Sequence, residues 1–258
     1  MMNFFNIIVS LSSRDILLPI NTPIRMLVIG DSIGNGTNEN YPAADTDDSI
    51  QGIAGADTLY EWDGFNLTER VRDTIGANNG SQYPSMAIKF KELTGRVTHI
   101  IETATGGDGL ARAAANNWTA GGNRYSPMLT KANSYLTNQG VLKFDFIKIV
   151  GGINDVRGTA TQAEIDEDIP DLISRLHSDF PNTPIVFTNI YAGSLKKDAT
   201  RALIANIVST DALVFEGEDS QNWNSSTYLF DGLHMYQTAN NGFGEADALL
   251  INNTVLQK

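Results

Sequence analysis

The sequence contains no cysteine among its 258 residues. Disulfide bonds, thiolate nucleophiles and cysteine-ligated metal sites are therefore excluded. A chain of this length can bury a core that is stable without cross-links, and secreted enzymes can also lack cysteine, so the cellular location stays open. Long apolar runs are absent as well, and none reaches the roughly 20 residues that a membrane-spanning helix needs.

Basic residues are scarce relative to acidic ones. The chain has 18 Lys and Arg against 30 Asp and Glu, which gives a formal net charge of −12. A surface of this sign repels nucleic acid and anionic membranes. We therefore expect a soluble protein that binds a neutral small molecule or glycan, and neither nucleic acid nor a membrane.

Three of the acidic residues, Asp45, Asp47 and Asp48, lie close together in the sequence. Their pattern lacks the glycine and the closing glutamate of an EF-hand calcium loop. We interpret the cluster as a solvated acidic loop. No metal ion and no organic cofactor is expected.

The first 11 residues are apolar, with two phenylalanines and two isoleucines among them. They lack the basic start of a signal peptide, and no small-residue cleavage site follows them. We interpret about residues 1–22 as an N-terminal arm or strand that packs on the domain or on a partner chain.

Five short apolar runs predict buried strands. Each is rich in aliphatic residues and ends at a glycine, an asparagine or a polar cluster. The runs are residues 25–29, 97–101, 144–150, 185–190 and 213–215. Continuous apolar runs of this kind are typical of a parallel sheet that is covered on both faces.

Helical patterns lie between these runs. Residues 85–93 place apolar side chains on one face, and Gly95 follows as a C-terminal cap. Residues 161–164 form a capping-box pattern, which opens a second helix with apolar residues at helical spacing. Pro170 lies inside this second helix and predicts a kink or a short break. A last helix is expected over about residues 244–256.

The alternation of strands and helices predicts a doubly wound α/β sheet, in a single domain over residues 1–258. Residues 35–82 do not fit this alternation, because they are rich in Gly, Asn and Asp. Long segments without regular structure are uncommon in compact domains and are usually functional. We therefore interpret residues 35–82 as an insertion beside the functional site.

A serine follows the first predicted strand directly, in the sequence Gly30-Asp31-Ser32. Ligands bind beyond the carboxyl ends of the strands in open α/β sheets, so Ser32 lies where a nucleophile is expected. The flanking glycine lets the chain turn sharply. A serine hydroxyl is a poor nucleophile on its own and needs a base within hydrogen-bonding reach.

The chain has only three histidines that could supply this base. His99 lies inside a predicted strand, which indicates a structural role, and His177 lies on the polar side of a helix, which indicates solvation. His234 lies in a loop after the last predicted strand. Asp231 precedes it by three residues and can orient the imidazole. We therefore predict a catalytic triad of Ser32, His234 and Asp231.

An acyl-transfer site also needs hydrogen-bond donors for the oxyanion that develops in the transition state. Two loops that follow predicted strands contain suitable groups. The backbone N–H of Gly107 and the side-chain amide of Asn154 are the predicted donors, together with the backbone N–H of Ser32.

Four sequence blocks in this order resemble those of the SGNH hydrolase superfamily, the GDSL-type esterases and lipases. The matching residues are Gly30-Asp31-Ser32, Gly107, Gly152-Ile153-Asn154-Asp155 and Asp231-Gly232-Leu233-His234. Each block alone is a weak or moderate signal, but all four in order, each after a predicted strand, are specific. The segment between Ser32 and Gly107 is longer than in compact members, and Gly242 follows His234 at an unusual distance.

This resemblance implies a three-layer α/β/α sandwich with a flavodoxin-like, five-stranded parallel sheet. It also implies that Ser32 is the nucleophile, His234 the base and Asp231 the residue that orients it. Ser32, Gly107 and Asn154 would form the oxyanion hole.

Two further segments, residues 80–86 and 106–109, are similar to those of carbohydrate acetylesterases in this superfamily. On this likeness Asp108 is a candidate substrate contact. Tyr60, Trp62 and Trp118 could provide stacking faces for sugar rings, although ordinary packing is the alternative for each ring. The polar insertion suits hydroxyl recognition better than an acyl chain, and no exposed apolar cap is evident.

The sequence therefore favours a carbohydrate O-acetylesterase. Two alternatives remain. The first is a lipolytic esterase or thioesterase of the same superfamily. The second is a non-catalytic glycan-binding module on the same scaffold.

Overall fold

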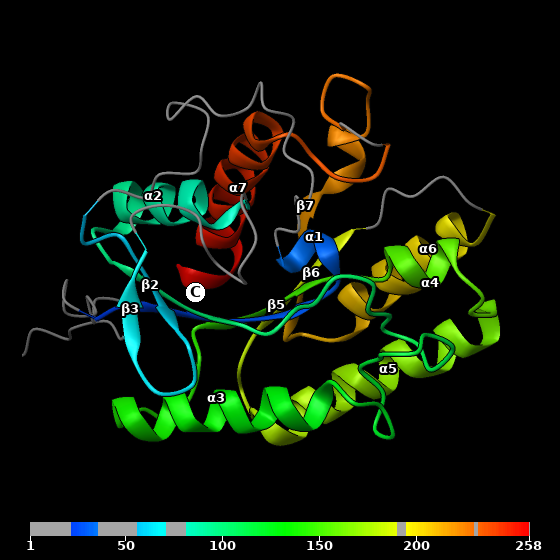
Figure 1. Cartoon of the computed structure of the whole chain (residues 1–258), viewed down its shortest axis with the longest axis horizontal. Coiled ribbons are helices and arrows are strands. Elements are labelled where there is room, and N and C mark those ends of the chain that lie inside the picture. The colour runs from blue at the N-terminus through cyan, green and yellow to red at the C-terminus, as the bar shows by residue number, and fades with distance from the viewer. Residues whose placement is uncertain (1–21, 36–55, 71–80, 190–194, 230–231, 258) are drawn as a thin grey trace, which may run out of the picture.

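A computed structural model describes residues 22–35, 56–70, 81–189, 195–229 and 232–257. Most of the predicted N-terminal arm, the acidic residues Asp45, Asp47 and Asp48, and Asp231 lie outside these described residues. The described elements form three layers, with a sheet between two layers of helices (Figure 1). The predicted α/β/α sandwich is therefore confirmed.

The sheet has seven strands in the described part of the chain, in the order β3-β2-β4-β1-β5-β6-β7. The strands are β1 (Ile24–Gly30), β2 (Leu59–Trp62), β3 (Leu67–Glu69), β4 (Thr98–Glu102), β5 (Phe146–Val150), β6 (Ile185–Asn189) and β7 (Val214–Asp219). Neighbouring strands are parallel, except that β3 runs antiparallel to β2. All parallel strands therefore present their carboxyl ends at one edge of the sheet.

Five of these strands, β1 and β4 to β7, correspond to the predicted apolar runs. The other two, β2 and β3, lie inside the predicted insertion 35–82, so the expected five-stranded sheet is corrected to seven strands. Leu59 and Trp62 of β2 are only 0% and 2% exposed. The two strands are only four and three residues long, so they contain few apolar residues. The Gly, Asn and Asp around them kept the segment from being predicted as a hairpin.

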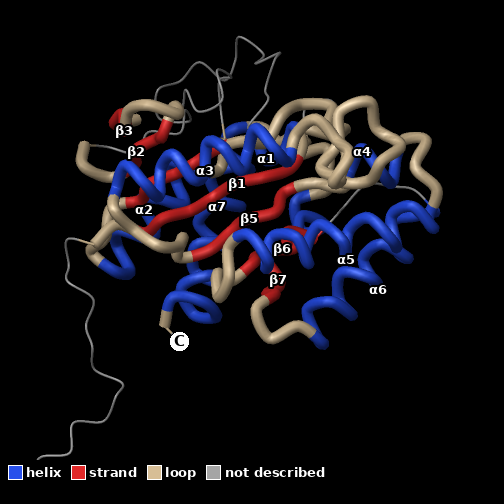
Figure 2. The backbone as a smooth tube through the Cα atoms, turned by 90° about the horizontal axis from the view of Figure 1, so that it is seen from below, coloured by secondary structure: helices blue, strands red, loops and turns tan. Residues whose placement is uncertain are grey.

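The helices are α1 (Ser32–Asn35), α2 (Tyr83–Thr94), α3 (Tyr125–Gln139), α4 (Ile153–Arg157), α5 (Gln162–Asp179), α6 (Leu195–Thr210) and α7 (Gln237–Ile251). Helices α2 and α7 cover one face of the sheet, and α3 and α5 cover the other (Figures 1 and 2). Both faces are apolar, because Met26 and Val28 of β1 pack in one hydrophobic cluster and Leu27 and Ile29 in the other. None of the helices in the described ranges is both long and apolar enough to cross a membrane.

The helix ends test the capping predictions. Gly95 ends α2 in the left-handed conformation, with φ 72°, and its N–H donates to the carbonyl of Lys91. Thr161 and Glu164 form the predicted capping box at the start of α5. Pro170 does not interrupt α5, so the predicted break is wrong. Proline has no backbone N–H, so the carbonyl of Asp166 loses its helical hydrogen bond. Asp166 is exposed, and its carbonyl can accept a hydrogen bond from water instead.

The last helix begins earlier than predicted, at Gln237 instead of about residue 244. The glycines in this segment serve close packing. A Cβ at Gly244 would lie 2.2 Å from the carbonyl oxygen of Gln82. Glycine therefore lets α7 approach the start of α2, against which it makes its main contact.

Candidate active site

The chain turns sharply where β1 ends. Gly30 has a φ of +142°, and a Cβ at this position would lie 1.8 Å from the carbonyl oxygen of Val150 in β5. The next N–H, that of Asp31, donates to the same oxygen at 3.0 Å. Only glycine allows this approach, and the turn places Ser32 at the start of α1, just beyond the carboxyl end of the central strand.

The side chain of Asp31 stabilises this turn through hydrogen bonds to the backbone. It is 1% exposed, and its carboxylate accepts from the backbone N–H groups of Ile33 at 3.0 Å and Ile153 at 3.3 Å. Burial raises the pKa of Asp31 to about 7, although both backbone hydrogen bonds oppose the shift. Asp31 therefore links the serine turn to the loop that follows β5.

Ser32 and His234 meet at this edge of the sheet, although they are 202 residues apart. The Nε2 atom of His234 lies 3.0 Å from the Oγ atom of Ser32. The histidine loop is closed by an antiparallel bridge between Leu229 and Met235 and leads into α7. Asp231, the predicted third member, lies outside the described residues. The contact between hydroxyl and imidazole is what general-base activation of a serine requires.

The other two histidines have structural partners. His99 is 9% exposed, and its Nδ1 atom lies 2.8 Å from the hydroxyl of Tyr135. Burial, with a smaller contribution from the charge of Arg25, lowers the pKa of His99 to about 4, so its ring is neutral at physiological pH. His177 lies 2.9 Å from a carboxylate oxygen of Asp211, so it is paired as well as partly solvated.

The two loops with the predicted oxyanion donors are joined to each other. Asn154 is the second residue of α4, and its side-chain amide donates to the carbonyl of Asp108 at 2.8 Å. This bond uses one of the two amide hydrogens. Gly107 is exposed, has a φ of +81° and occupies the turn just before Asp108. Both groups therefore lie on connected backbone beyond β4 and β5.

Gly107 belongs to a long segment, residues 103–124, which we call the 103–124 loop. It connects β4 to α3 and contains no helix or strand of its own, only an isolated bridge between Gly109 and Asn117. Charged side chains from other elements fix it. Asp155 of α4 accepts from Leu110 N at 2.7 Å and Ala111 N at 2.9 Å. Burial raises the pKa of Asp155 to about 6.

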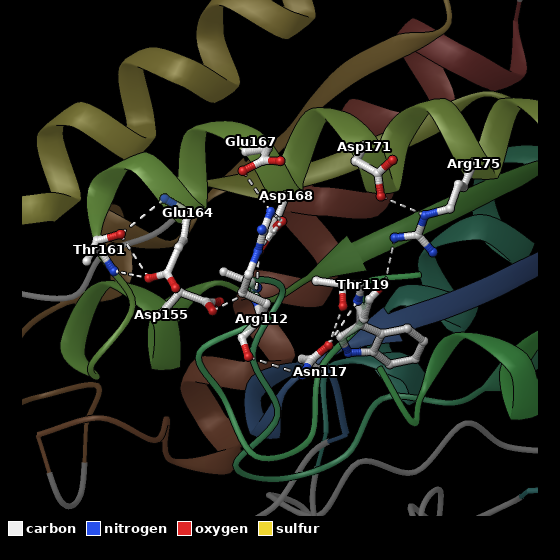
Figure 3. A network of polar contacts seen from close by, with 12 residues as sticks. Arg112, Asn117, Thr119, Asp155, Thr161, Glu164, Glu167, Asp168, Asp171 and Arg175 are labelled. Carbon is white, nitrogen blue, oxygen red and sulfur yellow. Dashed lines mark hydrogen bonds and ion pairs between the residues drawn. The ribbon is translucent and has the colours of Figure 1, made fainter. Parts of the chain in front are cut away.

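Helix α5 supplies the second set of anchors for the 103–124 loop (Figure 3). Asp168 accepts from the backbone N–H of Arg112 at 2.7 Å and also binds its guanidinium group through Nε and Nη2. Glu167 binds the same guanidinium at 2.8 Å. Arg175 donates to the carbonyl of Trp118 at 2.8 Å. The loop that bears Gly107 is therefore positioned by α4 and α5.

The predicted substrate aromatics are mostly buried. Trp118 is 0% exposed and donates from Nε1 to the carbonyl of Gly30 at 3.1 Å, beneath the serine turn. Trp62 is 2% exposed and donates to the hydroxyl of Ser134. Neither ring presents a face to a sugar, which corrects their predicted stacking role. Trp62 instead packs against Tyr135 of α3, and Trp118 lies in the hydrophobic core beside the end of β1.

The remaining predicted contacts also have internal partners. Asp108 is 0% exposed and forms an ion pair with Arg124 at 2.7 Å. Tyr60 is half-buried, and its hydroxyl donates to Asp57 at 3.0 Å. No group of three or more His, Asp or Glu side chains in the described ranges is arranged to hold a metal ion.

No protein-family model and no curated protein sequence matches this chain. Solved structures do. A protein from Arabidopsis thaliana has a TM-score of 0.71 and 16% identity, over 91% of this chain and 100% of that chain. A carbohydrate acetylesterase from Xanthomonas citri has a TM-score of 0.61 and 12% identity, over 91% and 57%. A family two carbohydrate esterase from Clostridium thermocellum, solved with cellohexaose, has a TM-score of 0.52 and 18% identity, over 92% and 66%.

The chain thus spans 57% and 66% of the two carbohydrate esterases. At identities of this size the likeness shows the fold alone. That fold is a three-layer α/β/α sandwich, as the resemblance of the four sequence blocks had implied.

Proposed function

We propose that this protein is a serine esterase in which Ser32 is the nucleophile and His234 the general base. The observation that carries the proposal is the 3.0 Å contact between Ser32 Oγ and His234 Nε2. It lies at the carboxyl edge of the sheet, where open α/β proteins bind their ligands. Ser32 itself is 6% exposed, so its side chain is packed by its surroundings.

The proposed reaction has two halves. His234 removes the proton of Ser32 while Oγ attacks the ester carbonyl, and the resulting oxyanion accepts hydrogen bonds from Ser32 N, Gly107 N and the Asn154 amide. The imidazolium then protonates the leaving alcohol, and an acyl-serine remains. In the second half His234 deprotonates a water molecule, which attacks the acyl-serine. The imidazolium then returns the proton to Ser32 Oγ as the acid is released.

Asp231 is proposed to accept a hydrogen bond from the other nitrogen of His234, on the strength of its position three residues earlier. A carboxylate there would select the tautomer that presents an unprotonated Nε2 to Ser32 and would stabilise the imidazolium.

We propose acetyl groups on a carbohydrate as the substrate class. Two of the structures with this fold are described as a carbohydrate acetylesterase and a carbohydrate esterase. The net charge of −12 suits a neutral substrate. Rates on short and long p-nitrophenyl esters separate this proposal from a lipolytic enzyme or thioesterase, which would favour the long acyl chains.

The test is acetate release from p-nitrophenyl acetate and from acetylated polysaccharides by wild type and Ser32→Ala. We expect the kcat of the variant to fall on the order of 10⁴-fold or more. Ser85→Ala is the matched control, because Ser85 is also 6% exposed but its hydroxyl donates to the carbonyl of Gln82, the residue before α2. Hydrolysis by Ser32→Ala at the wild-type rate would refute the assignment.

A further inference from the structure

The hairpin between β2 and β3 presents an exposed phenyl ring on a fixed turn. Phe65 is 84% exposed. The carboxylate of Asp63 accepts from the backbone N–H groups of Phe65 and Asn66, each at 2.7 Å, and Asp63 N donates back to Asn66 O at 3.1 Å. These backbone hydrogen bonds lower the pKa of the Asp63 carboxyl, so it stays ionised and bonded. The ring is therefore exposed on a rigid backbone.

An open groove of about 480 Å³ lies beside this ring, between the hairpin and α3. The hairpin turn reaches α3 in Figure 1, and the indole of Trp62 bonds to Ser134 across the gap at 3.0 Å. Trp62 is among the lining residues, but at 2% exposure its ring offers no face to a ligand. On the α3 side the lining of the groove is Asn133, Ser134, Thr137 and Asn138.

The chemistry of this lining is distinctive for so acidic a protein. Charged residues make up 19% of the chain, yet no lining residue of the groove carries a charge. Asn133 and Thr137 are exposed and one helical turn apart, so they face the same way. Their amide and hydroxyl groups can both donate and accept hydrogen bonds. An acyl chain would leave these groups unpaired, and an ionic ligand would find no counter-charge among the lining residues.

A single exposed phenylalanine is ordinary on a protein surface. A fixed aromatic ring next to neutral amide and hydroxyl groups is a more specific combination. A sugar ring has the complementary chemistry, because one face carries C–H groups and its edge carries hydroxyls. An exposed ring held in place by its backbone loses little conformational entropy when a ligand stacks on it.

We propose that the groove between the β2–β3 hairpin and α3 is a binding site for a neutral saccharide. Phe65 stacks on the C–H face of a sugar ring, and Asn133 and Thr137 bond to its hydroxyls. The lining of the groove includes neither Ser32 nor His234, and β4 lies between the hairpin and β1 in the sheet. It does not rest on the proposed esterase activity, since binding needs no catalysis.

The test is affinity electrophoresis of the native protein in gels that contain hydroxyethylcellulose, arabinoxylan or galactomannan. We expect at least one polysaccharide to retard the wild type, and Phe65→Ala to weaken the association about tenfold or more. Leu142→Ala is the matched control, because Leu142 is an even more exposed apolar side chain, at 99%, that does not line the groove. It should migrate as wild type does.

Catalytic readouts keep this proposal separate from the previous one. Phe65→Ala should hydrolyse p-nitrophenyl acetate at the wild-type rate, and Ser32→Ala should bind polysaccharide as wild type does. The saccharide site would be overturned if none of the three polysaccharides retards the wild type. It would also be overturned if wild type and Phe65→Ala are retarded equally. An apparent dimer that Phe65→Ala abolishes, without any retardation by polysaccharide, would replace it with an interface between copies of this chain.

Discussion

The anchoring of the 103–124 loop on α5 makes a specific prediction for Asp168→Asn. The change keeps the size of the side chain but removes the charge that binds both the backbone N–H and the guanidinium of Arg112. The Asp168 side chain is only 5% exposed, so water screens these bonds poorly. A hydrogen bond to a charged group contributes about 1.5–3 kcal/mol.

Two features of the structure reduce this value. The Arg112 side chain is 46% exposed and can be hydrated once it is released, and the new amide can still accept one bond. We therefore expect the free energy of unfolding to fall by about 1–2 kcal/mol. Loss of a whole oxyanion donor costs about 10²–10³ in kcat, so a loosened Gly107 should lower kcat by about tenfold and leave KM nearly unchanged.

The assay is the separate measurement of kcat and KM on p-nitrophenyl acetate, well below the unfolding temperature, together with urea denaturation. Glu167→Gln is the control. Glu167 binds the same guanidinium at 2.8 Å, but its side chain is 69% exposed, so its removal should change the stability by less than about 1 kcal/mol and leave kcat unchanged. An Asp168→Asn variant that is less stable but has the wild-type kcat would refute the positioning argument and leave Asp168 a purely structural residue.

Three further predictions follow from buried groups. Lys148 and Asp247 form an ion pair with both side chains 0% exposed. Asp247→Asn alone should therefore lower the free energy of unfolding, measured in urea, by about 3–5 kcal/mol, whereas the double change Lys148→Met and Asp247→Leu should recover most of that loss. Equal losses in the single and the double variant would contradict the pairing. The pKa of Asp31 is raised from 3.8 to about 7, so the native state holds a proton that the unfolded state releases, and wild type should lose stability as pH rises through this range. Asp31→Asn removes that dependence, so its melting temperature relative to wild type should be higher at pH 8 than at pH 4, and the opposite trend would count against a buried, protonated carboxyl. Gly30→Ala should yield little folded protein in a circular dichroism melt, because its Cβ would lie 1.8 Å from the Val150 carbonyl; a normal melt would show that β1 and β5 can separate there.

The α/β architecture and the contact between Ser32 and His234 could be predicted from local sequence. Buried parallel strands need continuous apolar runs, so β1 and β4 to β7 were visible as such, and the capping box of α5 is a four-residue pattern. Parallel strands share one carboxyl edge, so residues that follow different strands are expected to converge there. This is why a serine near residue 30 and a histidine 202 residues later could be paired in advance.

Only the tertiary structure decided how the chain supports that edge and which surfaces remain exposed. Whether Trp62 and Trp118 offered faces to a ligand or filled the interior depended on the elements that pack around them in the assembled fold, which no local pattern encodes. The pairing of Arg112 with Asp168 and of Lys148 with Asp247 joins residues 56 and 99 positions apart, and charged residues carry no sequence signal for their distant partners. Local sequence determines what an element can be, because its backbone bonds and apolar spacing are local. The burial of a side chain and the charge opposite it are properties of the assembled fold.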